Sequence, residues 1–185
     1  MSEEGDAQRG RRDAAAVRAE KERRAALLAK QVRQASLDRG SGHERFLVVG
    51  CGRDRYGLPL DSIETIRPKG AITLLPRVPA HVLGLTAQTG EVLTVVDLGR
   101  LLRSRDGGDE ANARIVVVSV RAERVALRVD EVVGIVAPSE TREFTATRGE
   151  SWLTAEHVKG LAEGSVLLLD IVAVLADPRV AVGSR

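Results

Sequence analysis

Nucleophilic and metal-binding side chains are scarce in this chain of 185 residues, which has one cysteine and three histidines. Cys51 follows an apolar run that begins at Phe46, so we expect its thiol to behave as a small buried hydrophobic group. A reactive cysteine would need a nearby histidine, and His43, His81 and His157 are scattered along the chain. No CxxC or HxxxH spacing is present to hold a metal. We therefore predict no catalytic, cofactor-binding or metal-binding residue.

Several aspartates offer carboxylates for acid–base chemistry, but their positions indicate structural roles. Asp97 and Asp170 each end an apolar run and occupy equivalent places in an internal repeat. Because the two aspartates are equivalent in the repeat, we expect them to have the same structural role, as the N-cap of the short helix that follows each. Asp61 and Asp130 also recur at one turn position, where aspartate commonly bonds to nearby backbone groups.

Motifs that bind phosphate or activate a serine are absent from the sequence. It contains no GxxxxGK[ST], GxGxxG or GxSxG pattern. The glycine-bounded segment Gly160–Gly164 is predicted to be a loop. Because nothing places a nucleophile beside a base, we predict that the chain is not an enzyme.

The elements that would position these residues are mostly strands. After Glu44, short β-branched runs alternate with glycine, proline and aspartate, which is typical of all-β architecture. The strand signals cover 45–68, 91–97, 113–136 and 165–170. The two capped helices are expected at 98–102 and 171–175.

This all-β portion contains an internal repeat. Residues 45–66 align without a gap to residues 114–135, with seven identities in twenty-two positions. Two further matches follow in the same order, His81–Leu85 with His157–Leu161 and Val92–Leu98 with Ser165–Ile171. Each copy is therefore predicted to contain a strand, a turn, a second strand, an irregular stretch and a third strand that ends in aspartate. The recurrence of both histidines favours turn or packing roles for them.

The repeat predicts two β-barrel subdomains, at about 45–110 and 111–178, with some exchange of terminal strands. A unit of this size would bury only about 60% of its surface if it folded alone. We therefore expect the two units to share one apolar core within a single domain at 44–178, with a groove between them. Residues 179–185 would form a short tail.

An N-terminal extension, residues 1–43, precedes this domain. Its composition predicts one helix from about Asp13 to Leu37, with a Gly-Ser joint after it. The apolar stripe of that helix is thin and is interrupted by Lys21; it consists of Val17, Ala25, Leu28, Val32 and Ala35. Such a helix is more typical of a docking or tethering arm than of a core element, so it should be dispensable for barrel folding.

Charge is concentrated in this extension. The chain has a net charge of +2, and residues 45–185 are neutral, while residues 9–33 carry a net +6. The arm could attract nucleic acid or an anionic membrane surface, which stays an alternative function. Nucleic acid is not the expected partner, because aromatic residues make up only 2% of the chain and are spread over separate segments.

The cellular location is predicted from features that are missing from the sequence. No apolar run approaches the roughly 20 residues that span a bilayer, and no apolar segment follows the acidic N-terminus. The single cysteine agrees with a reducing compartment. A cytoplasmic protein without direct membrane insertion is predicted.

Four segments together resemble the CheW-like domain family, which provides adaptors for bacterial chemotaxis. The matching segments are Tyr56–Ile66 for YGxPxxxVxEI, Leu75–Leu85 for the LPxxPxxVxG approach to NLRG, Val92–Leu98 for VxPVxDL and Val125–Val132 for GLxVDxV. Their order and spacing match the family over about 135 residues. The resemblance implies two five-stranded SH3-like barrels with short helices.

The same resemblance implies a function without catalysis or cofactor. Members couple the cytoplasmic tip of methyl-accepting chemoreceptors to the regulatory domain of a CheA-type histidine kinase, in receptor arrays at the inner membrane. In the family the receptor tip lies near the groove between the subdomains, and one barrel end contacts the kinase. A CheW-like regulator of a pathway other than motility is the alternative within the same fold.

The resemblance also points to partner-binding positions, which are Ile63, Thr65, Gly84, Thr89 and Val132. Two of them depart from the family, because Thr89 replaces a common arginine and Thr65 stands where an acidic residue is common. Either the partner differs correspondingly or the chain is an atypical adaptor. We expect Ile63→Asp to weaken receptor binding while the fold survives.

Overall fold

The computed structural model describes residues 15–17, 19–20, 22–24, 26–31, 44–103, 112–121, 123–138, 140–144 and 152–180. Ten strands lie in these residues: β1 Phe46–Cys51, β2 Asp54–Pro59, β3 Ile63–Pro68, β4 Val82–Gln88, β5 Glu91–Asp97, β6 Arg114–Val120, β7 Glu123–Val129, β8 Glu131–Val136, β9 Val158–Ala162 and β10 Val166–Leu169. The short helices are η1 Leu60–Ser62, α2 Leu98–Leu102, η3 Glu163–Ser165 and α3 Ile171–Ala176.

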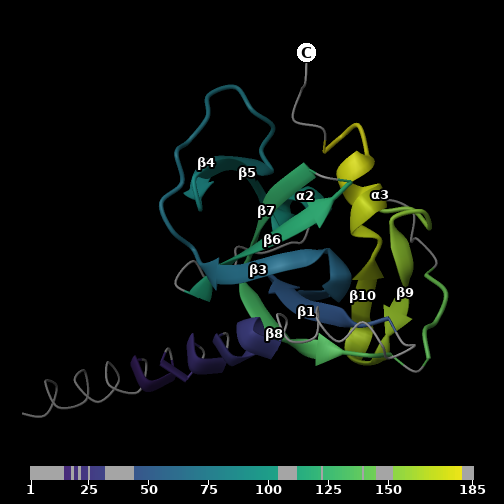
Figure 1. The fold of residues 1–185 in the computed structure, drawn as a ribbon. Coiled ribbons are helices and arrows are strands. Elements are labelled where there is room, and N and C mark those ends of the chain that lie inside the picture. Colours follow the sequence, from purple (N-terminus) through teal and green to yellow (C-terminus); the bar gives the residue numbers. More distant parts are fainter. Residues whose placement is uncertain are drawn as a thin grey trace, which may run out of the picture.

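The strands form two five-stranded mixed sheets, so the predicted all-β fold with two five-stranded units is confirmed (Figure 1). The first sheet has the order β8-β1-β2-β10-β9 and the second has the order β3-β6-β7-β5-β4. Strands at equivalent positions of the repeat therefore occupy equivalent positions in the two sheets. Each sheet also takes strands from both halves of the repeat, 45–110 and 111–178. More strands are exchanged between the two halves than predicted, because neither half holds a complete sheet.

Alternating side chains of single strands supply different parts of the core. Successive residues of a strand point to opposite faces, and β1 is buried on both. Leu47 and Val49 enter a large cluster that also contains Val116 and Val118 of β6. Phe46 belongs instead to a smaller cluster that draws on the first sheet alone. One apolar core thus spans both sheets, as the predicted sharing requires.

The two aspartates at the ends of β5 and β10 cap the helices that follow them, as predicted. The carboxylate of Asp97 accepts a hydrogen bond from the backbone nitrogen of Arg100 at 2.9 Å. The carboxylate of Asp170 accepts one from the backbone nitrogen of Ala173 at 3.0 Å. Each cap satisfies a backbone donor that a helix start leaves open.

Each predicted irregular stretch ends in a strand, β4 or β9, and the expectation of a loop at Gly160–Gly164 is wrong because Gly160–Ala162 belong to β9. Gly84 in β4 and Gly160 in β9 have φ values of 142° and 153°, which other residues rarely adopt. These glycines let a neighbouring loop approach, and isolated bridges join Thr73 to Leu85 and Arg142 to Leu161. Glycine lowers strand propensity, which explains why the sequence pattern hid β4 and β9.

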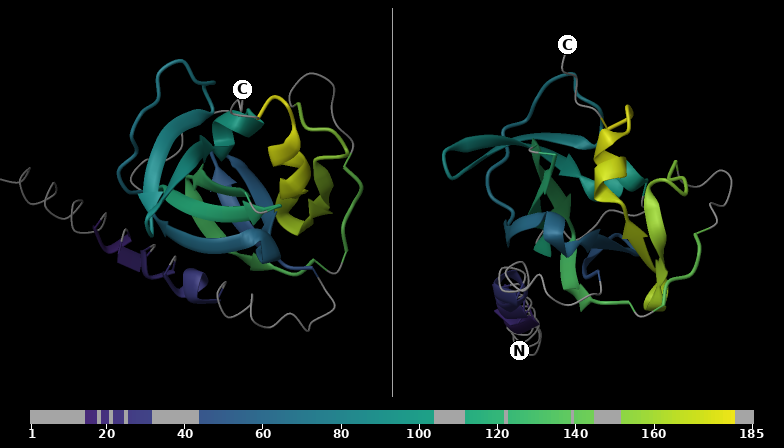
Figure 2. Two further views of the ribbon diagram at one scale, coloured as in Figure 1. Left: turned by 45° about the horizontal axis from the view of Figure 1, so that its top comes forward. Right: turned by 45° about the vertical axis from the view of Figure 1, so that its right-hand side comes forward.

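The N-terminal helix, meaning the described residues between 15 and 31, contacts the barrels. It runs beside β3 and β8 in all three views (Figures 1 and 2). Leu28 is only 8% exposed, and Ala29 packs against the large core cluster. Of the predicted apolar stripe, Leu28 is buried and Val17 is 57% exposed, while Ala25, Val32 and Ala35 lie outside the described residues. The contact between the helix and the barrels was not predicted, and the dispensability of the helix for barrel folding stays a prediction.

Candidate partner-binding surface

The described residues offer no arrangement suited to catalysis. No group of three or more histidine, cysteine or carboxylate side chains that could hold a metal occurs among them. Cys51 is 1% exposed within the large core cluster, which confirms it as a small buried hydrophobic residue. Burial raises the pKa of its thiol above the ordinary range, and the negative charges of Asp130 and Asp97 add to the rise. A thiol held neutral in this way is a poor nucleophile.

A buried charge network stands near Cys51, and it has a structural function. Arg128 contacts the carboxylates of both Asp97 and Asp130, and all three side chains are buried. Asp130 also accepts a hydrogen bond from the backbone nitrogen of Gly52. Asp130 and its repeat partner Asp61 therefore differ, because Asp61 is exposed and Asp130 bonds across the repeat. The interpretation of Asp130 as a local turn residue is incomplete.

The surface that the N-terminal helix contacts lies between two sheet edges. β8 is an edge of the first sheet and β3 is an edge of the second. The β3–β8 surface, as we define it, consists of Thr65–Pro68 of β3, Arg114 of β6 and Val132–Val133 of β8. Sheet edges carry unpaired backbone groups and need a cover. In this chain the cover is the N-terminal helix.

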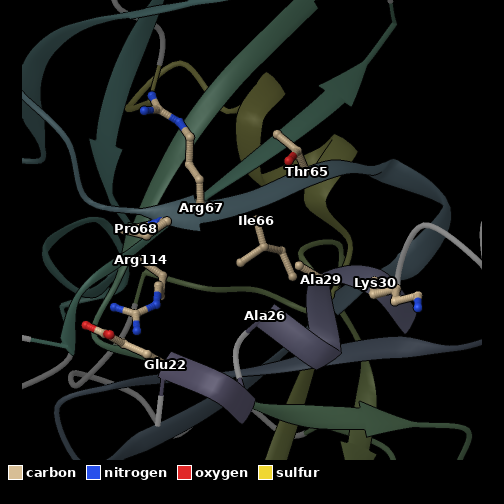
Figure 3. Close-up of a pocket in the computed structure, with 9 residues that line it drawn as sticks. All are labelled: Glu22, Ala26, Ala29, Lys30, Thr65, Ile66, Arg67, Pro68 and Arg114. Carbon is tan, nitrogen blue, oxygen red and sulfur yellow. The ribbon is translucent and has the colours of Figure 1, made fainter. Parts of the chain in front are cut away.

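Two cavities mark the contact between the helix and this surface. The larger, about 560 Å³, lies between helix residues and β3, and its lining is Glu22, Ala26, Ala29, Lys30, Thr65, Ile66, Arg67, Pro68 and Arg114 (Figure 3). The smaller, about 190 Å³, lies beside Arg24 and is bounded by Arg55, Asn112, Arg114, Glu131, Val132 and Val133. Arg114 lines both cavities, so it lies between the part of the surface formed by β3 and the part formed by β8. The helix therefore bridges the two edges.

Two of the predicted site residues meet on this surface. Thr65 lines the larger cavity and Val132 lines the smaller one, and both side chains are half-buried. Ile63 is different, because it is 4% exposed and belongs to the large core cluster. The expectation that Ile63→Asp would spare the fold is therefore wrong, since a carboxylate there would enter the core.

The other two predicted residues, Gly84 and Thr89, line neither cavity. Gly84 is buried in β4, where an added Cβ would overlap the carbonyl oxygen of Thr73. Thr89 is exposed in the tight turn between β4 and β5. That hairpin is tied to β3 through Arg124, whose guanidinium contacts the carboxylates of Glu64 and Glu91.

Arg114 and the place of the helix on the barrels are the site features that sequence reasoning missed. Arg114 is 6% exposed, and its guanidinium donates to the backbone oxygens of Asn112 and Ala113. One signal was present, because Arg114 is identical to Arg45 at the equivalent position of the repeat. Its place between two cavities depends on packing that no local pattern reveals.

The class that the fold defines is a double five-stranded β-sheet domain with a shared core and a helix beside two sheet edges. Comparison with known families then identifies it more closely. Residues 45–179 match the model of the CheW-like domain. The chain belongs to the CheW-like domain family, whose members are non-catalytic chemotaxis scaffolds.

Individual relatives agree with this assignment. The chain is 29% identical over 122 residues to Protein FrzA of Myxococcus xanthus, which covers 66% of this chain and 76% of that protein. It is 22% identical over 143 residues to chemotaxis protein CheW of Klebsiella aerogenes, covering 75% and 85%. The crystal structure of scaffolding protein TtCheW from Thermoanaerobacter tengcongensis superposes with a TM-score of 0.65 at 17% identity, over 76% of this chain and 93% of that one.

Within the described residues, no helix has the length and apolar character that crossing a bilayer requires. The exposed side chains of the N-terminal helix include the basic residues Arg23, Arg24 and Lys30.

Proposed function

We propose that this chain couples chemoreceptors to a CheA-type histidine kinase and that its β3–β8 surface receives a helix of the receptor tip. The family match over residues 45–179 supports the scaffold function. The observation that carries the choice of surface is that a helix, the chain's own, already packs there. A surface that accommodates one amphipathic helix has the shape and apolar contacts for another.

The residues of this surface suggest what the receptor helix should present. Ile66 supplies an apolar floor at 8% exposure, and Val132 continues it on the β8 side. Arg114 adds a cation to the lining of the larger cavity, whereas the guanidinium of Arg67 is turned away from the helix and donates to Thr86 (Figure 3). We therefore propose a partner helix with apolar residues at i, i+3 or i+4 spacing and a carboxylate beside them.

Gly84 and Thr89 have separate places in this proposal. Gly84 supports the barrel that carries β3, through the close approach of the loop at Thr73. Thr89 is a candidate contact at the β4–β5 turn, outside the main surface. The variant Thr89→Arg restores the residue common in the family, so an ordinary chemoreceptor should bind it equally well or better.

The kinase would bind elsewhere on the barrels, through its regulatory domain, and the chain would thereby join receptor arrays. Co-sedimentation tests the coupling directly. Membranes that contain a chemoreceptor are mixed with the kinase, and the kinase should sediment only when this chain is added. A kinase that sediments equally without the chain would contradict the scaffold function.

Two variants test the surface in the same assay. Thr65→Lys and Val132→Lys each place a charge in the proposed contact and should weaken sedimentation of the chain by about tenfold. Ala155→Lys is the matched control, because Ala155 is exposed in the turn before β9 and lies outside both cavity linings. Thermal unfolding of all three variants verifies that they fold. The surface is wrongly placed if both lysine variants bind as the control does.

A further inference from the structure

The N-terminal helix uses one face to contact the β3–β8 surface. Glu22, Ala26, Ala29 and Lys30 all line the larger cavity, and their spacing of four, three and one places them on one side of a helix. Leu28 lies outside this face, one residue before Ala29, and is buried, whereas Leu27 is 63% exposed. The barrels are therefore contacted through Leu28 and Ala29, while the cavity lies along the face of Glu22 and Ala26.

One carboxylate and one guanidinium border the same cavity. Figure 3 shows Glu22 on the helix side of this cavity and Arg114 on the barrel side. Arg114 is buried, whereas Glu22 is exposed. The helix thus combines small apolar residues with one carboxylate, which is the pattern proposed above for the receptor helix.

We propose that the N-terminal helix is an internal competitor, which covers the β3–β8 surface and must leave before a partner helix can dock. This inference rests on the proposed function, because it concerns access to the same surface. Thr65 and Val132, the two predicted site residues that reach the surface, line cavities that residues of the helix also line. One surface cannot hold two helices at once.

Competition has a measurable consequence for affinity. The apparent dissociation constant of the partner equals its intrinsic value divided by the fraction of molecules with the helix detached. If the helix is detached in about one molecule in ten, freeing it raises the apparent affinity about tenfold. A signal that holds the helix away would therefore strengthen coupling.

Leu28→Glu in the full chain should free the helix, because it places a carboxylate where the leucine is buried. Leu27→Glu is the matched control, with the same change on the exposed neighbour. Coverage is read from a reporter, Thr65→Cys, through the rate of its reaction with a thiol reagent. The native Cys51 contributes little to that rate, because it is buried.

We expect the reporter to react about tenfold faster with Leu28→Glu than with Leu27→Glu. Without the reporter, the same two variants are titrated with a soluble fragment of a chemoreceptor cytoplasmic tip. Leu28→Glu should bind that fragment about tenfold more tightly than the wild type, and Leu27→Glu should match the wild type.

A second pair of variants serves in case Leu28→Glu impairs folding. Ala26 and Pro68 line the same cavity from opposite sides, so Ala26→Cys with Pro68→Cys should be joined by a short bismaleimide. The joined protein should lose binding of the receptor fragment. Leu27→Cys with Pro68→Cys is the control and should cross-link poorly, because Leu27 is directed to solvent.

The outcomes separate this inference from the proposed function. Equal reporter rates in both glutamate variants, or equal cross-linking in both cysteine pairs, would overturn coverage by the helix. Faster reaction with unchanged receptor affinity would overturn competition. The Thr65→Cys reporter could also react faster with Leu28→Glu while no variant binds the receptor fragment. That result would support coverage of the surface by the helix, but it would contradict both the proposed receptor site and competition for it.

Discussion

The carboxylate of Asp130 accepts a hydrogen bond of 2.6 Å from the backbone nitrogen of Gly52, which lies 78 residues earlier in the chain. Gly52 begins the turn between β1 and β2, and Asp130 lies between β7 and β8. The backbone nitrogen of Asp130 in turn donates to the carbonyl oxygen of Gly50 at 3.0 Å. These two bonds join the first sheet to the chain that leaves the second.

Removal of the Asp130 side chain should therefore destabilise the whole domain. Asp130→Ala removes a carboxylate that contacts the buried guanidinium of Arg128 and should cost about 3 kcal/mol of unfolding free energy. Asp61→Ala is the control, because Asp61 is the exposed repeat equivalent and should change stability by less than about 0.5 kcal/mol. Urea denaturation measures both. Equal losses would show that the buried network adds nothing.

Gly84 should tolerate no side chain. An added Cβ would overlap the carbonyl oxygen of Thr73, and the φ of 142° is unsuited to alanine. Gly84→Ala should therefore destabilise the fold by about 3 kcal/mol or more. Gly134→Ala in β8 is the control, because nothing lies within 4 Å of the added atom and its φ is ordinary. Thermal and urea unfolding should find that control neutral or slightly stabilised, and a comparable loss in both variants would contradict the close approach.

A single substitution in the turn between β4 and β5 should raise the stability of the fold. Thr89 and Gly90 have φ values of 47° and 85°, and positive φ at both positions is the requirement of a type I′ hairpin turn. Threonine is strained there because it is β-branched, whereas asparagine tolerates the conformation. Thr89→Asn should raise the unfolding free energy by about 1 kcal/mol. Gln88→Asn, in the last residue of β4, should bring no such gain, and a loss at Thr89→Asn would rule out this turn geometry.

Alkaline pH should weaken the fold through Cys51. Burial holds its pKa above the ordinary thiol value of about 8.5, so the unfolded chain loses the proton first as pH rises. Stability is unaffected by this group at lower pH, and above about pH 8.5 it declines by up to about 1.4 kcal/mol per pH unit. Urea denaturation between pH 7 and 10 should give a steeper decline for the wild type than for Cys51→Ala. Parallel curves would mean that the folded thiol ionises normally.

Much of this protein was predictable from local sequence patterns, because those features depend on neighbours in the chain. Short, continuous β-branched runs predict strands such as β1 and β6, because both faces of each strand are buried over most of its length. Asp97 and Asp170 cap the helices that follow, because a cap needs only a backbone nitrogen three residues ahead. The repeat likewise indicated two similar sheets and a shared core.

Other features were decided only by the tertiary structure, because their partners are distant in sequence. The strands of the two repeats exchange between sheets, so β3 pairs with β6 and β8 pairs with β1. Glycine-containing β4 and β9 become strands through pairing that outweighs their low propensity. Asp61 and Asp130 share a sequence position and differ in environment, because only Asp130 faces Gly52 and Arg128.

The candidate surface likewise combines features that were predictable from the sequence with features that only the tertiary structure decided. Thr65 and Val132 were identified by motif position, whereas Ile63 next to them is turned into the core by a register shift between Ile63 and Thr65. The N-terminal helix was predicted from composition, because helix propensity is local. Its place on β3 and β8 was not, because a stripe of Leu28 and alanines becomes an interface only where two sheet edges supply the matching surface.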